Sequence, residues 1–117
     1  MDPNKIKETI SIRMDQLSNF TMLEPGELDA FNAVANEIAY YTRLFKPQAY
    51  DAMMKSIEKH TNTYEELTNQ LSIDSKDVIS EVKPRDVPQK HMEHLKGLRD
   101  AIVESYFDII YRFEVLP

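Results

Sequence analysis

Residues 47–71 read PQAYDAMMKSIEKHTNTYEELTNQL, and their apolar and aromatic side chains recur at intervals of seven along two lines. The first line is Tyr50, Ile57, Tyr64 and Leu71, and the second is Met53, His60 and Leu67. A heptad kept over about three repeats puts both lines on one side of an α-helix. The pattern therefore predicts one long helix from 47 to about 71. A break at the weak helix formers Thr61, Asn62 and Thr63 is the alternative.

The C-terminal region carries a second seam of the same kind. Leu95, Ile102 and Ile109 are seven apart, which predicts a helix over about 88–114. The neighbouring line is Met92, Tyr106 and Phe113, and three further apolar residues, Val103, Phe107 and Ile110, widen it. This apolar face is broader than a helix in a four-helix bundle has to bury, and such an excess is typical of a surface that another chain covers.

The N-terminal half contains two more helix signals. Asp2 is a good N-cap and Pro3 suits the first helical position, so a helix is predicted over 3–18. Its apolar residues, at helical spacing, are Ile6, Ile10, Met14 and Leu17. The next helix starts near the sequence EPGE at 24–27 and ends at Lys46-Pro47, because proline disfavours a helical residue before it. Its seam is Leu28, Phe31, Ala35, Ile38 and Phe45, with Thr42 as the one polar member.

Four amphipathic helices joined mostly by short connections predict an all-α fold, an up-and-down four-helix bundle that forms a single domain over 1–117. The one long connection, 72–87, is expected to contain a short extra helix at about 75–82. Alternating helix directions bring two aromatic groups to the same end of such a bundle. These groups are Tyr40, Tyr41, Phe45 and Tyr50, and Tyr106, Phe107, Tyr111 and Phe113.

Composition narrows the functional classes. The 117 residues include 42% hydrophobic and 29% charged ones, which is typical of a folded water-soluble domain. Two glycines in the whole chain disfavour hairpin-rich folds and phosphate loops. The absence of cysteine fits a cytoplasmic location, and no apolar run in the sequence approaches the length of a membrane span. The net charge of −6 argues against nucleic acid as a partner, because phosphates repel acidic surfaces.

The stretch YEELTNQLSIDSKDVIS, residues 64–80, raises an alternative function. The positions where a helix-turn-helix buries apolar residues are held by Leu67, Leu71, Ile73, Val78 and Val82. Residues 66–82 therefore resemble that family of DNA-binding motifs, and the resemblance implies a transcriptional regulator that uses 64–82. The second helix of the motif would offer Lys76 against Asp77 and Glu81, whereas contact with phosphates requires positive charge. DNA binding is therefore the alternative function and not the first one.

Side chains suited to catalysis or metal binding are few. His91 and His94 share a helix face, but a stable metal site needs three or four ligands. The sequence has no Glu-x-x-His pair of the kind that di-iron bundles use, and a surface pair with His60 on the helical seam is the simpler interpretation. No glycine-rich phosphate loop is present in the sequence either. We expect a protein that is not an enzyme and that uses no metal or cofactor.

The remaining signals are surfaces. The C-terminal helix supplies the predicted partner-binding residues, which are Tyr106, Phe107, Ile110, Tyr111 and Phe113. The segment 24–42 has acids and no lysine or arginine, and its predicted acidic face is Glu24, Glu27, Asp29 and Glu37. We expect a protein partner, and a homodimer formed through the C-terminal helix. The sequence thus predicts a small regulator, inhibitor or adaptor, of the kind frequent among bacterial and phage accessory proteins, that acts through an apolar and aromatic helix face.

Overall fold

A computed structural model of the chain describes residues 2–23, 26–76 and 87–116, with side chains described in 2–23, 26–71 and 89–116. Within these ranges the secondary structure is entirely helical. The helices are α1 (Pro3–Ser18), α2 (Glu27–Arg43), α3 (Pro47–Lys76) and α4 (Val87–Arg112). The predicted all-α class is confirmed.

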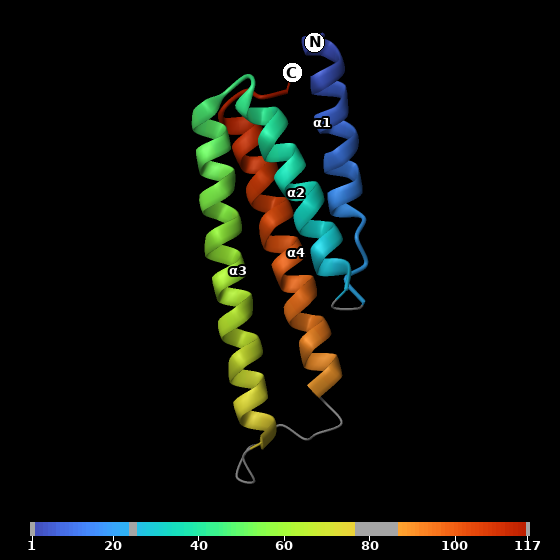
Figure 1. Cartoon of the computed structure of the whole chain (residues 1–117), viewed down its shortest axis with the longest axis vertical. Helices are drawn as coiled ribbons and strands as arrows, with labels where there is room; N and C mark the ends of the chain where they lie inside the picture. The colour runs from blue at the N-terminus through green and yellow to red at the C-terminus, as the bar shows by residue number, and fades with distance from the viewer. Residues whose placement is uncertain (1, 24–25, 77–86, 117) are drawn as a thin grey trace.

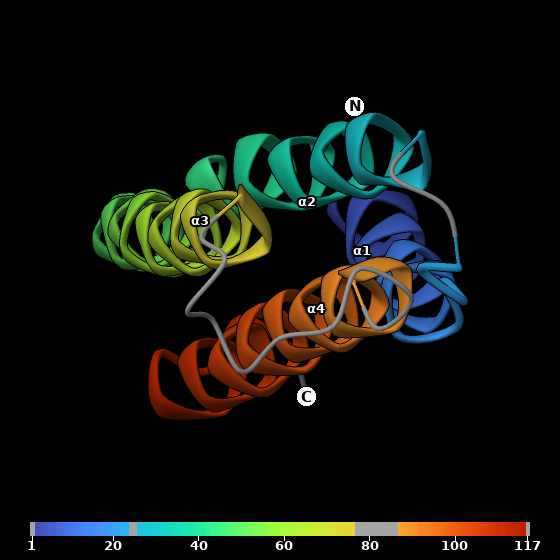
Figure 2. The ribbon, with the colours of Figure 1, turned by 90° about the horizontal axis from the view of Figure 1, so that it is seen from below.

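The four helices lie side by side along the long axis of a molecule that measures 58 × 22 × 18 Å (Figure 1). Successive helices run in opposite directions, so that α1 and α3 begin at the end where α2 and α4 finish. Seen from below, the helices follow one another around the axis (Figure 2). The pairs in extensive contact are α1 with α2, α2 with α3, α3 with α4, and α1 with α4. Helices α2 and α4 are therefore diagonal to each other.

Helix α1 forms where the sequence predicts it. The Asp2 carboxylate accepts a hydrogen bond from the Asn4 N–H at 2.9 Å, which satisfies one of the free donors of the first turn. Pro3 occupies the first turn, where its missing N–H has no consequence. The four predicted core residues, Ile6, Ile10, Met14 and Leu17, are all buried.

The connection between α1 and α2 is held by side chains from α2 and α4. The Glu27 carboxylate accepts hydrogen bonds from the Met22 N–H at 2.8 Å and from the Thr21 hydroxyl at 2.9 Å. Arg99 of α4 donates to the Phe20 carbonyl at 2.8 Å. Met22 has a positive φ of 54° and a fully buried side chain. These bonds hold a backbone conformation that a non-glycine residue adopts only at a cost.

Helix α3 is continuous through Thr61–Thr63, which confirms the prediction of one long helix and excludes the break. It ends at Lys76, whereas the sequence predicts an end near 71. Residues 75–76 of the predicted short helix at 75–82 thus belong to α3. Residues 77–82 of that prediction lie outside the described residues.

Helix α4 ends in a Schellman motif two residues before the predicted end. The Val115 N–H donates to the Ile110 carbonyl at 3.0 Å, and the Glu114 N–H donates to the Tyr111 carbonyl at 3.2 Å. Glu114 occupies the left-handed position of the motif, with φ 55°, where glycine is usual. The turn directs Val115, only 1% exposed, back into the core.

The core contains the predicted seams, and hydrogen bonds made by side chains also join the helices there. Tyr106 of α4 is fully buried, and its hydroxyl donates to the Ala35 carbonyl of α2 at 3.0 Å, across the diagonal of the molecule. The Ser56 hydroxyl of α3 donates to the Ser105 hydroxyl of α4 at 2.7 Å. The large majority of buried polar groups in proteins are hydrogen-bonded, and both of these hydroxyls follow that rule.

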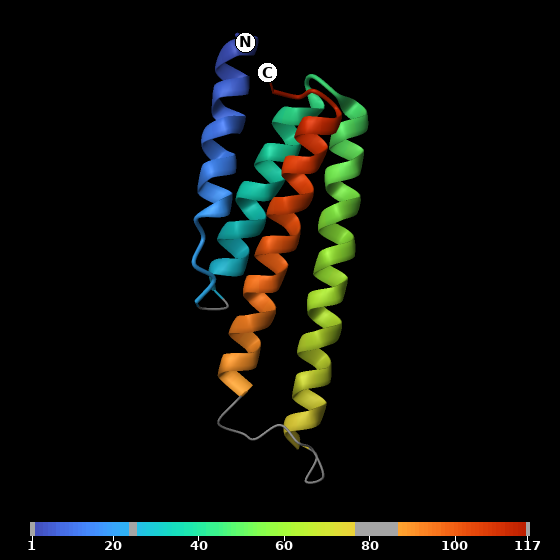
Figure 3. The ribbon, with the colours of Figure 1, turned by 180° about the vertical axis from the view of Figure 1, so that it is seen from behind.

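The prediction that Leu67 belongs to the buried seam is wrong, because Leu67 is 46% exposed. The α2 helix has 17 residues and α3 has 30, so roughly the last dozen residues of α3 extend past α2. The same overhang of α3 and α4 is visible from behind (Figure 3). At this level α4 is the only described helix beside α3, and the outer of the two heptad lines of α3 is left open.

Candidate functional site

The five predicted partner-binding residues of α4 divide into two groups. Tyr106 and Ile110 are buried, at 0% and 7% exposure, and Phe113 is half-buried. Tyr106 and Ile110 belong to the core, which corrects their prediction as contact residues, and Phe113 packs against the core with part of its side chain exposed. Phe107 is 50% exposed and Tyr111 is 87% exposed. Phe107 and Tyr111 are exposed because they are one turn apart on the side of α4 that faces solvent.

Tyr106 shows why a broad apolar face on α4 need not be a surface. Its ring fills the interior, and its hydroxyl bonds to a backbone carbonyl. Burial raises the pKa of Tyr106 well above its ordinary value, because the phenolate would have no water around it. Part of the apolar width of α4 is therefore buried in the core, through Tyr106 and Ile110.

The exposed pair Phe107 and Tyr111 lies among acidic side chains. Asp108, between them, pairs with Arg112 at 3.4 Å. Glu104 and Glu114 are exposed, and neither makes an ion pair within the described part of the chain. We use the name outer face of α4 for the aromatic pair together with the charged residues next to it, which are Glu104, Asp108, Arg112 and Glu114.

The predicted acidic face on α2 is not an open surface of one charge. Glu27 is occupied by the bonds to Thr21 and Met22 described above. Glu37 forms an ion pair with Arg13 of α1 at 3.1 Å. Asp29 is exposed, and Glu24 lies outside the described residues. The prediction is corrected, because two of these acids hold α2 to α1 and to the connection before it.

A second exposed apolar pair lies on α2. Tyr40 is 60% exposed and Leu44 is 55% exposed, again about one turn apart. Both pairs lie towards the end of the molecule where α2 and α4 finish (Figure 1), which is where the sequence places its two aromatic groups. Because α2 and α4 are diagonal, the two pairs belong to separate surfaces. No acidic pattern like that of α4 surrounds Tyr40 and Leu44 in the sequence, where Arg43 and Lys46 are close.

The three histidines lie at the contact between α3 and α4. The His91 Nε2 atom lies 3.1 Å from the Tyr64 hydroxyl, and the two rings meet edge to face. His60 and His94 line a cavity of about 240 Å³ between α3 and α4. Burial, with the neighbouring charge of Lys59, lowers the pKa of His60. No group of three or more potential metal ligands occurs among the described residues.

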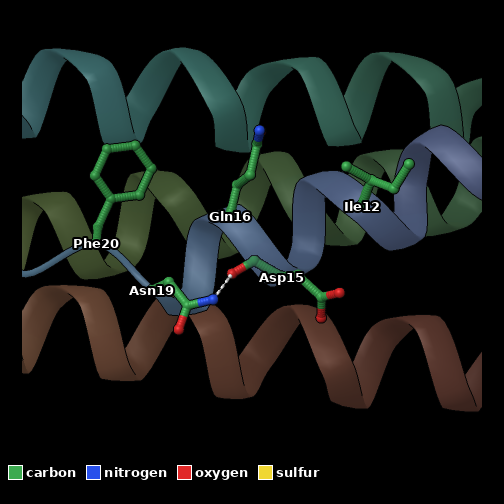
Figure 4. Close-up of a pocket in the computed structure, with 5 residues that line it drawn as sticks. All are labelled: Ile12, Asp15, Gln16, Asn19 and Phe20. Carbon is green, nitrogen blue, oxygen red and sulfur yellow. Dashed lines mark hydrogen bonds between the residues drawn. The ribbon is translucent and has the colours of Figure 1, made fainter.

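The other hollow of note lies on the outer side of α1 and is shown in Figure 4. It is open, with a volume of about 600 Å³, and is lined by Ile12, Asp15, Gln16, Asn19 and Phe20. The Asn19 amide donates to the Asp15 carbonyl at 2.8 Å, and Gln16 accepts from Arg13 at 2.8 Å. The Asn19 amide and the Gln16 side chain are thus engaged with their own helix, and the lining residues include no nucleophile paired with a base.

The helix-turn-helix resemblance at 64–82 requires a turn after its first helix. Helix α3 runs without interruption through 72–74 to Lys76, so that turn is not formed there. Residues 77–82, which would hold the second helix of the motif, lie outside the described residues. No helix in the described part of the chain contains a stretch long and apolar enough to cross a membrane.

Comparison of the chain with known protein families, with curated proteins and with solved structures found no match. The function of the protein therefore has to be inferred from its own residues and their arrangement.

Proposed function

We propose that this chain is a non-enzymatic module for protein–protein contact, a small regulator, inhibitor or adaptor built on an up-and-down four-helix bundle. The observation that carries the proposal is the exposure of two large aromatic side chains, Phe107 and Tyr111, on adjacent turns of α4. A few residues supply most of the binding energy at protein interfaces, and these residues are enriched in tryptophan, tyrosine and arginine. The proposed contact surface is the outer face of α4.

The local structure supports this surface in two ways. The Schellman motif and the buried Val115 fix the end of α4, so the two aromatic side chains are presented on a rigid helix. The buried Tyr106, one residue before Phe107, anchors the same turn to α2. A preorganised surface loses less conformational entropy when a partner binds.

The test is affinity capture from cells of the source organism with the tagged protein and two double variants. Phe107→Ser with Tyr111→Ser removes the proposed contact, and Tyr40→Ser with Leu44→Ser is the matched control on α2. All four side chains are at least half exposed, so both variants should keep the wild-type circular dichroism spectrum.

We expect at least one captured protein to be lost with the α4 variant and retained with the α2 variant. Truncation of a hot-spot side chain weakens binding by about 2 kcal/mol or more. Identical sets of captured proteins from the wild type and the α4 variant would contradict the proposal.

A further inference from the structure

The charged residues around Phe107 and Tyr111 specify the chemistry of a partner. Asp100, Glu104, Phe107 and Tyr111 follow one another at spacings of four, three and four, which places them along one stripe of α4. All four are exposed. Glu114 continues the stripe just after the helix, giving a surface about 20 Å long.

This stripe carries a strong charge of one sign. Residues 100–116 contain four acids and one arginine, and the arginine, Arg112, already pairs with Asp108. Asp100 likewise accepts from Arg99 at 2.9 Å, whereas Glu104 and Glu114 form no ion pair within the described part of the chain. An aromatic pair between two unpaired carboxylates is complementary to apolar residues flanked by lysine or arginine.

A hollow next to Tyr111 also combines carboxylates with apolar side chains. It is open, with a volume of about 680 Å³, and its lining residues are Asp108, Tyr111, Arg112, Glu114 and Leu116. Lysine and arginine side chains combine an apolar stem with a charged end. The stem can lie against Tyr111 and Leu116 while the charged end meets the Glu114 carboxylate, and the Tyr111 ring adds an attraction for a cation.

The same charges disfavour a second copy as the occupant. A twofold interface brings one patch against itself, so each charged residue needs its complement within that patch. Here the carboxylates of one copy would face those of the other, and like charges facing each other oppose association. Nucleic acids and anionic membranes are repelled for the same reason.

From this geometry we infer that the outer face of α4 binds a basic amphipathic helix, which lays apolar residues on Phe107 and Tyr111 and lysine or arginine beside Glu104 and Glu114. Such a helix uses anchors at i, i+4 and i+7, which match the length and the single stripe of this surface. The inference rests on the proposed function and names the class of partner.

The experiment uses a phage-displayed library of helical peptides with leucine at i, i+4 and i+7 and random residues at the flanking positions. Selection is carried out at low salt on the full-length wild type, on Glu104→Lys with Glu114→Lys, and on a matched control, Glu58→Lys with Glu65→Lys. The control changes the net charge equally at two exposed positions of α3.

We expect the wild type and the control to enrich lysine and arginine at the flanking positions, and the α4 variant to enrich aspartate and glutamate. Peptides selected on the wild type should bind the α4 variant about tenfold more weakly at low salt, and this difference should shrink as salt is added. Binding of all selected peptides should disappear with Tyr111→Ser.

Three results would overturn the inference and leave the proposed function standing. One is selection of peptides that need Tyr111 but show no preference for basic residues. Another is a dimer at micromolar concentration, instead of the 13.7 kDa monomer, that Tyr111→Ser dissociates, because the occupant would then be a second copy. The third is failure to obtain any peptide whose binding requires Tyr111. The proposed function itself fails separately, if capture from cells is unchanged when Phe107 and Tyr111 are replaced.

Discussion

Tyr106→Phe tests the diagonal contact with two measurements on one variant. The change removes a hydroxyl that donates to the Ala35 carbonyl at 3.0 Å and leaves the ring in its fully buried place. The carbonyl keeps its position in the backbone ladder of α2, so no buried group is stranded. The variant should therefore lose only the net value of one hydrogen bond, about 1 kcal/mol of unfolding free energy at neutral pH.

The second measurement records the same difference as the pH rises. Burial raises the pKa of Tyr106 in the folded state, while the unfolded chain titrates near the ordinary tyrosine value of about 10. A raised pKa contributes stability that is complete below pH 10 and is lost as pH rises, because only the unfolded state gains from releasing the proton. Above that pH the wild type should lose about 1.4 kcal/mol per unit through this residue, and phenylalanine should lose none.

The two effects together predict a crossing. The wild type should be more stable by about 1 kcal/mol at pH 7, equal to Tyr106→Phe near pH 11, and less stable beyond it. Urea unfolding followed by circular dichroism at a series of pH values measures both curves. Other alkaline effects cancel, because they act on both proteins. A difference that stays constant with pH would refute the assignment of Tyr106 as a buried, neutral donor.

Three further substitutions test other parts of the fold by urea unfolding. Leu95→Ala should lower the unfolding free energy by about 2–5 kcal/mol and Leu67→Ala by less than about 1, because only Leu95 is fully buried; equal losses would mean that the overhang is packed against something. Glu27→Ala should cost about 1–3 kcal/mol through the Met22 N–H it leaves unpaired, and Asp29→Ala, an exposed acid in the same turn, under about 0.5; similar values for both would rule out the proposed role of Glu27. Glu114→Gly should be about 1 kcal/mol more stable than Glu114→Ala, since glycine alone is unstrained at φ 55°, and the reverse order would be inconsistent with the Schellman motif.

The helices themselves could be predicted because each carries its own signal. The Asp2-Pro3 start and the four apolar residues of α1 define that helix without reference to the rest of the chain. The heptad from Tyr50 to Leu71 likewise outweighed three weak helix formers, since packing along a whole face contributes more than local propensity.

The surfaces could be predicted only in part, because exposure depends on neighbours that a periodic pattern does not contain. Leu67 and Leu71 belong to the same pattern, yet Leu67 is open and Leu71 is buried, according to which side of α3 meets α4 beyond the end of α2. Tyr106 and Phe107 are adjacent aromatic residues, yet Tyr106 is buried and Phe107 is exposed. Their helical phase could be drawn from the sequence, but the diagonal bond to Ala35 could not.

The predicted acidic face failed for a related reason. Glu27 contacts Met22 of the preceding connection, and Glu37 contacts Arg13 of the preceding helix. The helical pattern of α2 alone does not indicate either contact. The acids of α4 carried no such prediction, although Glu104 and Glu114 lie three residues before Phe107 and three residues after Tyr111 in the sequence. Charge alone does not distinguish a bond that holds the fold from a group that is free for a partner.

The overhang of α3 and α4 should open locally at a lower free-energy cost than the part of the molecule where four helices pack. Where four helices pack, an opening that exposes a backbone amide must disrupt several interfaces, but beyond α1 and α2, within the described part of the chain, it need separate only α3 from α4. Amide protons of α3 should therefore exchange with solvent progressively faster from Met53 towards Leu71. Phe107 and Tyr111 lie at the opposite, slowly exchanging end, so thermal fraying of the overhang leaves their geometry intact.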